Sequence, residues 1–253
     1  MEKIKDKKTN FIAPAIVFVL MYAGIELIIR TFNIQQWILP TPTNILLTFY
    51  ANFVSEILPH TYVTLKGIII GFLIAVPLGI TIAFFLSQFE ILDKAFSPYV
   101  IFLSTTPLIT LVPLLMIWLG FGIKVKILAV TIQTFPIIMM NSVTGFNNVE
   151  TLKLELMTSL GANRLQTFFN VTLPASLPNV FTGIKLGTIF STIAAISTEF
   201  VGGKTGLGSR IVYYTSYIKT NLAFACILAV TLIGIVLYSI VSLLEEKLVK
   251  WNI

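Results

Sequence analysis

Long runs of apolar residues dominate this chain, and most charged residues lie between them. A helix needs about 20 mostly apolar residues to cross the hydrocarbon core of a bilayer. Six segments meet this requirement, the fifth of them by continuing upstream through Lys185: residues 11–25 (extended to 30 if Glu26 lies at an interface), 67–89, 95–123, 127–149, 178–198 and 220–244. The pattern predicts an all-α, polytopic membrane protein with about six transmembrane helices.

Composition supports the same class. The chain has 253 residues, of which 56% are hydrophobic and 11% charged, with a mean hydropathy of +0.92. Soluble domains are about a quarter charged, so an ordinary soluble fold is excluded. The first apolar run is not followed by a small-residue cleavage site, which favours a retained helix over a signal peptide. We expect residues 1–10 to form a cytoplasmic tail and residues 11–253 a single membrane domain.

Lysine and arginine indicate the orientation, because they gather on the cytoplasmic side of membrane proteins. The N-terminal cluster, Lys3, Lys5, Lys7 and Lys8, gives the strongest signal and predicts that both termini are cytoplasmic. This orientation assigns Lys124, Lys126 and Lys204 to outside segments. The net charge of +6 fits contact with anionic lipid headgroups. The basic residues form no patch interleaved with aromatic residues, so we expect no nucleic-acid partner.

Residue types that carry catalysis or bind metals are scarce. Cys226 and His60 are the only cysteine and histidine, and Asp6 and Asp93 are the only aspartates. One cysteine excludes an intrachain disulfide, and one histidine leaves no paired-histidine metal motif. The sequence therefore predicts no enzyme activity, no catalytic, cofactor-binding or metal-binding residue, and no cofactor.

The segment at about 148–178 carries two apolar stripes. Leu152, Leu156 and Leu160 follow a helical spacing, and Gly161 then interrupts the pattern. A second stripe consists of Leu165, Phe168 and Phe169, and Pro174 and Pro178 are expected to close the segment. The pattern predicts two short amphipathic helices joined at a glycine. Such a pair either lies flat on the membrane or offers a docking surface to a partner.

The stretch EFVGGKTGLG at 199–208 contains Gly203-Lys204-Thr205, which is similar to the core of a phosphate-binding loop. Such a loop also needs a glycine five residues before Gly203, where this chain has Thr198. The stretch also follows a membrane helix, on the side that holds no ATP supply. We therefore expect no nucleotide site here.

Glu199 is an ionisable residue at the end of the fifth span, which makes it a candidate for the substrate path or a gate. The alternative is a wet interface position, paired with Lys204 or Arg210. A carboxylate on the path favours a neutral or cationic ring over a bare anion.

One family resemblance is specific. The EAA loop of binding-protein-dependent ABC importer permeases reads Glu-Ala-Ala, three residues, Gly, nine residues, Ile, one residue, Leu-Pro. This chain has Glu155, Leu156, Met157, Gly161, Val171, Leu173 and Pro174 at those positions, so the spacing matches while both alanines and the isoleucine are replaced. The similarity continues in LPTPTNIL at 39–46, PLLMIWLGFG at 113–122 and EFVGGKTGLG. It is strongest with the nitrate, sulfonate and taurine branch. The last stretch also resembles permeases for thiamine-precursor pyrimidines and riboflavin.

The resemblance implies a type I importer permease in the bacterial plasma (inner) membrane, which passes a small solute and works with a separate cytoplasmic ATP-binding subunit. It further implies an extracytoplasmic solute-binding protein and a second copy of the chain. The residues implied to couple the permease to its ATPase are Glu155, Leu156, Met157, Leu160, Gly161, Arg164, Leu173 and Pro174. Lys153 and Arg164 flank the turn and are expected to pair with charges of that partner. A stand-alone secondary transporter or channel remains the alternative; it accounts for the spans but not for the spacing of the loop.

Overall fold

A computed structural model describes residues 2–249, with side chains described for 13–89 and 91–249. The expected tail at residues 1–10 lies outside the described side chains. Helices make up nearly all of the described chain: α1 (Glu2–Thr31), α2 (Pro42–Ala51), α3 (Leu58–Gln88), α4 (Glu90–Thr105), α5 (Leu108–Leu119), α6 (Ile123–Asn147), α7 (Thr151–Ser159), α8 (Arg164–Thr167), α9 (Leu173–Gly202), α10 (Leu207–Ser216) and α11 (Thr220–Leu248). Two π-helical turns, Phe53–Ile57 and Phe168–Thr172, lead into α3 and α9.

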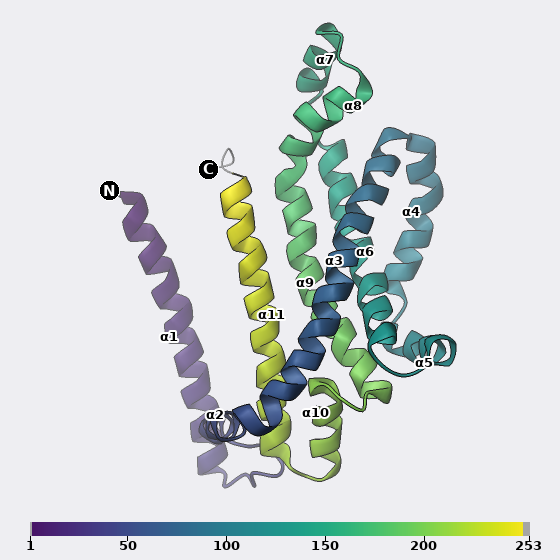
Figure 1. The fold of residues 1–253 in the computed structure, drawn as a ribbon. Helices are drawn as coiled ribbons and strands as arrows, with labels where there is room; N and C mark the ends of the chain where they lie inside the picture. Colours follow the sequence, from purple (N-terminus) through teal and green to yellow (C-terminus); the bar gives the residue numbers. More distant parts are fainter. Residues whose placement is uncertain (1, 250–253) are drawn as a thin grey trace.

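The long helices run roughly side by side, and the short ones gather at the two ends (Figure 1). Helix α6 packs between α3 and α9, and α11 packs against α9. Helices α7 and α8 protrude at one end, which we call the α7 end; α2 and α10 lie at the other, the α10 end. The start of α1 and the end of α11 point toward the α7 end.

Five helical segments in the described chain are long and apolar enough to span a membrane, or six when a bent pair is taken as one span. That pair corrects the expected single helix at 95–123. Helices α4 and α5 meet at an angle of 94°. Thr106 and Pro107 between them have extended backbones, because a proline disfavours helical geometry in the residue before it. The run at 95–123 contains no charged residue, so its hydropathy gave no sign of the break.

Two other boundaries differ from the expectation. Helix α3 begins at Leu58 rather than near 67, and Thr64 in its early turns is buried, with its hydroxyl bonded to Glu199. Helix α9 begins at Leu173, so Pro174 opens this helix and Pro178 lies within it, whereas both were expected to close the preceding segment. A proline in the first turn is tolerated because the N–H that it lacks has no partner there.

Small residues bring the central helices into direct contact, as the Gly67/Gly71 and Gly183/Gly187 spacings indicate. A Cβ placed on Gly71 would lie 2.6 Å from Cβ of Val130 on α6. On the opposite side of α6, a Cβ on Gly183 would lie 2.8 Å from Cβ of Asn141. The backbones of α3 and α9 therefore rest on α6 without room for a side chain.

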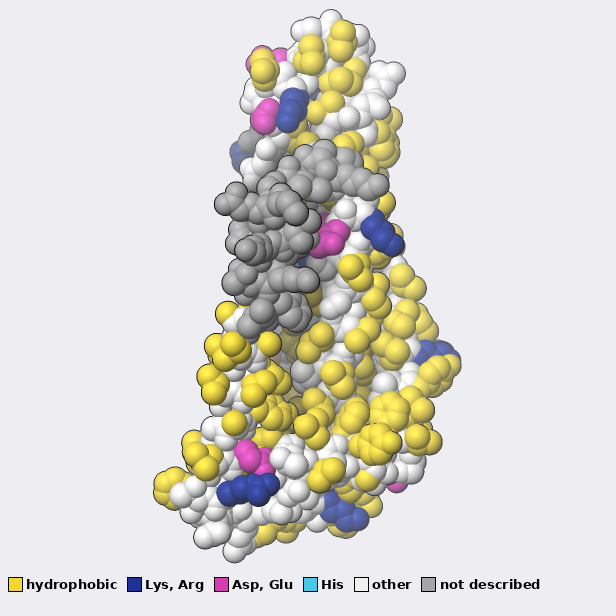
Figure 2. All heavy atoms as spheres, turned by 90° about the vertical axis from the view of Figure 1, so that its left-hand side faces the viewer, with side chains coloured by type: hydrophobic (Ala, Val, Ile, Leu, Met, Phe, Trp, Pro, Cys, Tyr) yellow, Lys and Arg dark blue, Asp and Glu magenta, His cyan; other side chains and the backbone are white. Residues whose placement is uncertain are grey.

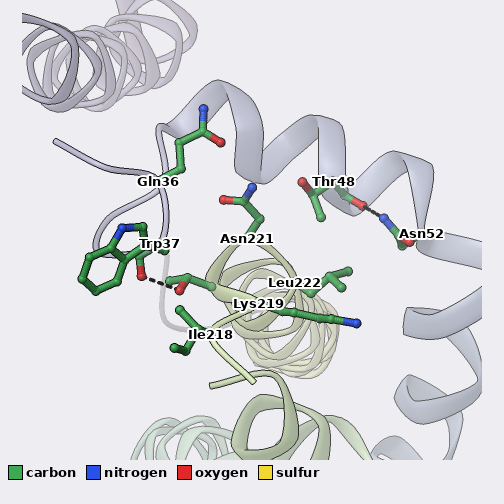
Figure 3. Close-up of a pocket in the computed structure, with 9 residues that line it drawn as sticks. Gln36, Trp37, Thr48, Asn52, Ile218, Lys219, Asn221 and Leu222 are labelled. Atoms are coloured by element: carbon green, nitrogen blue, oxygen red, sulfur yellow. Dashed lines mark hydrogen bonds between the residues drawn. The ribbon is translucent and has the colours of Figure 1, made fainter. Parts of the chain in front are cut away.

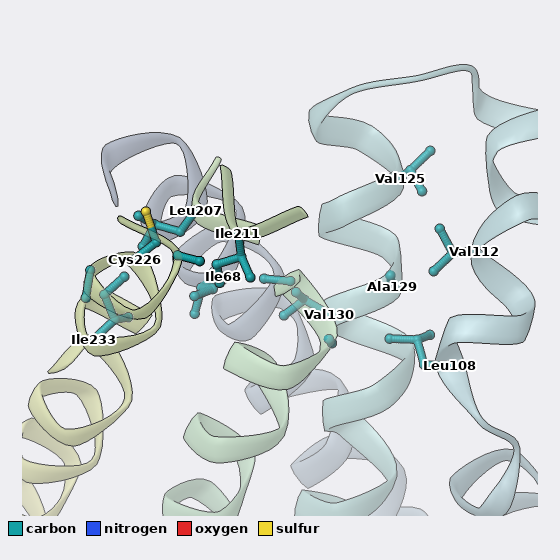
Figure 4. Packing of buried hydrophobic residues seen from close by; sticks show 14 of the residues in the cluster. Ile68, Leu108, Val112, Val125, Ala129, Val130, Leu207, Ile211, Cys226 and Ile233 are labelled. Carbon is teal, nitrogen blue, oxygen red and sulfur yellow. The ribbon is translucent and has the colours of Figure 1, made fainter. Parts of the chain in front are cut away.

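The largest buried cluster lies toward the α10 end and joins α3, α5, α6, α9, α10 and α11 (Figure 4). Its members include Ile68, Val112, Ala129, Leu207 and Cys226, each fully or nearly fully buried. Large apolar side chains also cover much of the outside, and hydrophobic residues form a broad area on the face shown in Figure 2. An apolar exterior around an apolar interior is the arrangement of a bilayer-embedded bundle.

Replacing Gly71 with valine should destabilise the bundle, because the new side chain collides with Val130 and with the carbonyl oxygen of Ile127. We expect a loss of about 1–3 kcal/mol, seen as a lower melting temperature of the detergent-solubilised protein. The matched control is Gly24→Val on α1, where a new Cβ meets nothing within 4 Å. Equal melting temperatures for the two variants would contradict the close α3–α6 packing.

Candidate functional site

The carboxylate of Glu199 is buried at the α10 end, with 2% of the residue exposed. It forms an ion pair with Lys126 of α6, which is 6% exposed. Thr64 of α3 donates its hydroxyl to Oε1 of Glu199 at 2.8 Å. Glu199 is therefore buried and paired with Lys126, which contradicts the alternative of a wet interface position paired with Lys204 or Arg210.

Lys126 is the residue that sequence reasoning missed. It was assigned to an outside segment, but α6 begins at Ile123 and carries Lys126 into the bundle in its first turn. Its aliphatic stem crosses Gly67 of α3, where any Cβ would collide with the Lys126 side chain. A lysine one turn into a helix, together with a glycine on an earlier span that leaves room for its stem, is the signal that could have identified it.

Glycines of the EFVGGKTGLG stretch form the rest of the carboxylate's surroundings. The backbone N–H of Gly208 donates to Oε2 of Glu199 at 2.7 Å, and the N–H of Leu207 donates to the Thr64 hydroxyl at 2.9 Å. Gly206 has φ +112° and lies so close to the carboxylate that a Cβ would overlap it. The stretch is thus the end of a helix and a turn that encloses Glu199. A nucleotide-binding loop follows a strand, whereas helix α9 precedes Gly203 here.

A cavity of about 350 Å³ opens beside the ion pair. Its walls come from α3, α5, the amino end of α6, the end of α9 and the turn between α9 and α10. The polar lining residues are Lys126, Thr198, Glu199, Lys204 and Thr205; the apolar ones include Val63, Met116, Phe121, Ile123 and Val125. The structure therefore places the predicted path residue on the wall of a cavity of ligand size.

Two further polar contacts hold α10 in place. Tyr214 donates its hydroxyl to Glu56 at 2.7 Å, and Nε of Arg210 donates to Nε2 of His60 at 2.6 Å. Burial, followed by the hydrogen bond to Glu56, raises the pKa of Tyr214 well above its ordinary value, so this phenol stays protonated. Arg210 is thus engaged with His60 and not with Glu199.

A second cavity of about 540 Å³ lies at the same end, between the segment before α2, α2 itself and the start of α11 (Figure 3). Thr220 donates its hydroxyl to the carbonyl oxygen of Trp37 at 2.6 Å. Asn221 lies between α2 and α11 in the same view. This cavity contains none of the predicted site residues.

The predicted coupling residues lie at the α7 end, where the expected pair of short helices is present. Gly161, with φ +74°, separates α7 from α8, and a capping box between Asn163 and Gln166 starts α8. Leu152, Leu156 and Leu160 are 75%, 60% and 72% exposed, and Glu155 and Arg164 are also exposed. The structure thus brings Glu155, Leu156, Met157, Leu160, Gly161 and Arg164 together in one protruding tip (residues 152–164), which we call the coupling tip after the role predicted for it. Leu173 and Pro174 lie apart from it, in the first turn of α9.

The prediction of a second apolar stripe is only partly confirmed. Phe168 is buried against Phe84 and Phe146, with ring centroids 4.5 and 5.1 Å apart, whereas Leu165 and Phe169 are exposed. Phe168 therefore anchors the base of the loop, and the tip beyond it remains uncovered. Lys153, expected to pair with a partner's charge, forms an ion pair with Glu150 at 3.2 Å.

Replacing Lys126 with methionine should destabilise the protein strongly, because it leaves the Glu199 carboxylate buried and unpaired. We expect a loss of roughly 3–5 kcal/mol in thermal unfolding, and recovery of most of it in the Lys126→Met/Glu199→Gln double variant. The control is Lys124→Met, at an exposed position in the same turn. A single variant as stable as the parent protein would show that the pair does not hold this end together.

Comparison with known proteins identifies the family of the chain. Residues 75–250 match the family described as "Binding-protein-dependent transport system inner membrane component". A Bacillus subtilis permease protein named for aliphatic sulfonate transport, SsuC, is 30% identical over 87% of this chain and 80% of its own length. The riboflavin transport system permease protein RibX of Chloroflexus aurantiacus is 30% identical over 85% of this chain and 81% of its own.

Among solved structures, a chain of the MetNI methionine ABC transporter in an inward-facing conformation superposes with a TM-score of 0.56. It is 21% identical and covers 78% of this chain and 94% of its own. This likeness confirms the predicted all-α type I importer permease fold. The chain therefore belongs to the family of binding-protein-dependent transport system inner membrane components.

Proposed function

We propose that this membrane permease subunit takes up a small solute by docking its coupling tip on a separate cytoplasmic ATP-hydrolysing subunit. The observation that supports this most directly is the exposure of Leu152, Leu156 and Leu160 on a tip that stands clear of the bundle. Three leucines at helical spacing suit the groove of a protein partner. A loop lying flat on the membrane does not account for a tip that points away from the helices.

Helix α9 provides the mechanical connection. It begins at Leu173, next to the loop, and ends at Gly202, beyond the buried Glu199. Movement of the coupling tip by the ATP-binding partner is therefore carried along one continuous helix to the α10 end. ATP binding biases two arrangements of the bundle, inward-open and outward-open, and the permease chain itself hydrolyses nothing.

Orientation and assembly follow from the same proposal. The α7 end, with both termini, faces the cytoplasm, and the α10 end receives solute from an extracytoplasmic binding protein. The N-terminal lysine cluster supports this orientation. Two copies of the chain enclose the path, which is consistent with the many large apolar side chains that α4 and α5 leave exposed. The solute is small and either anionic, as the name of SsuC suggests, or neutral, as that of RibX suggests.

Changing the coupling tip should abolish uptake without preventing folding. Gly161 has φ +74° and nothing within 4 Å of a new Cβ, so Gly161→Val changes the backbone of the turn without a steric clash. Glu155→Lys reverses an exposed charge on α7. We expect both variants to reach the membrane at normal levels and to lose ATP-driven uptake in proteoliposomes that contain the ATP-binding subunit and binding protein.

The matched control is Glu246→Lys, another exposed charge reversal on the same side of the bundle but outside the loop. It should transport normally. Normal uptake by Gly161→Val, with ATP hydrolysis still linked to transport, would contradict the coupling assignment. Co-purification distinguishes the importer permease from a stand-alone transporter, because only the importer permease should co-purify with an ATP-binding subunit.

A further inference from the structure

We propose that the cavity beside the Lys126–Glu199 pair is a contact site for a small organic anion, a carboxylate or sulfonate with a short apolar body. The inference rests on the proposed importer function and specifies the chemistry of the solute at the α10 end. The cavity holds about 350 Å³, which is within the range of small-molecule sites. Whether the cavity binds an anion or a cation depends on which hydrogen-bond donors and acceptors on its wall are still free.

Three donors already surround the carboxylate of Glu199: the Lys126 ammonium, the Thr64 hydroxyl and the N–H of Gly208. Oε1 accepts from Lys126 and from Thr64, and Oε2 accepts from Thr64 at 3.1 Å and from the N–H of Gly208 at 2.7 Å. The Thr64 hydroxyl has one hydrogen, which it shares between the two oxygens, and the Lys126 ammonium balances the charge of the carboxylate. Glu199 therefore does not present a free negative charge to a solute, contrary to the expectation that it favours a neutral or cationic ring.

Donors, in contrast, remain available. An ammonium group has three N–H donors, and within the described part of the chain Lys126 uses two, on Glu199 and on the carbonyl oxygen of Val63. Lys204 lines the same cavity, is exposed, and has no acidic partner among the described residues. Two lysines and one glutamate on the wall leave one positive charge in excess.

The amino end of α6 adds to this positive environment. Gly122 precedes the helix, and no side chain caps its first turn. The first N–H groups of a helix lack partners within it and carry a partial positive charge. Ile123 and Val125 in this turn line the cavity, so the helix end faces the same space as the two lysines.

The apolar part of the wall consists chiefly of Met116, Phe121 and Val63. A ligand that fits therefore has a short hydrocarbon part against this wall and an anionic group near Lys204 and the start of α6. An alkanesulfonate or a short carboxylate has this shape. An anionic lipid headgroup shares the charge but comes from the bilayer, so the test has to separate the two sources.

Fluorine NMR of the full-length protein in phosphatidylcholine nanodiscs tests the proposal, with trifluorobutanesulfonate as the probe and trifluorobutylamine as its cationic counterpart. We expect line broadening of the sulfonate and none of the amine. Lys204→Gln should weaken sulfonate binding roughly tenfold, as expected for the loss of one charged hydrogen bond, and Lys204→Arg should retain it. Lys124→Gln removes an exposed lysine that does not line the cavity and should leave binding unchanged.

Equal broadening of both probes, or unchanged binding by Lys204→Gln, would overturn the proposal. Displacement of the sulfonate when phosphatidylglycerol is added to the nanodiscs would also overturn it, because the site would then be a headgroup site. ATP-driven uptake is measured separately. Intact uptake without sulfonate binding rejects only the anion site, whereas sulfonate binding without ATP-driven uptake rejects the importer function and leaves the site standing.

Discussion

The ion pair between Glu199 and Lys126 is the constraint on which the α10 end depends. Either charge alone costs several kcal/mol when it is removed from water, so each needs the other and further hydrogen bonds. Thr64 and the backbone of Gly208 supply those bonds to the carboxylate. The pair therefore determines which helices must meet here, α3, α6, α9 and the start of α10, and why glycine occupies positions next to it.

The same helix that carries Glu199 also reaches the other end of the molecule. Helix α9 has 30 residues, which corresponds to about 45 Å at 1.5 Å per residue. At its far end, Phe168 packs between Phe84 and Phe146 and holds the base of the loop to the bundle. Both ends of this connection are thus anchored while the tip between α7 and α8 stays uncovered. In the proposed mechanism, this helix carries the displacement of the coupling tip to the α10 end.

Local patterns in the sequence were sufficient for some of this architecture and not for the rest. Apolar runs predicted the spans, and the leucine spacing with Gly161 predicted the two short helices, because both depend on neighbouring residues. The break before Pro107 was missed because hydropathy does not report backbone geometry. The partner of Glu199 was missed because Lys126 lies 73 positions away, and such a contact is created only when the helices pack. Leu165 and Phe169 share a stripe with Phe168, yet only Phe168 finds a surface to cover it.

Site-directed cross-linking tests the central claim, that the coupling tip is where the ATP-hydrolysing subunit docks. The chain suits this measurement, because its only cysteine, Cys226, is buried. A cysteine at Leu156 on the tip is compared with one at Tyr50, which is 86% exposed at the α10 end. With a bifunctional maleimide and the assembled transporter, we expect Leu156→Cys to cross-link to the ATP-binding subunit and Tyr50→Cys not to. Cross-linking through Tyr50→Cys, with none through Leu156→Cys, would contradict the account.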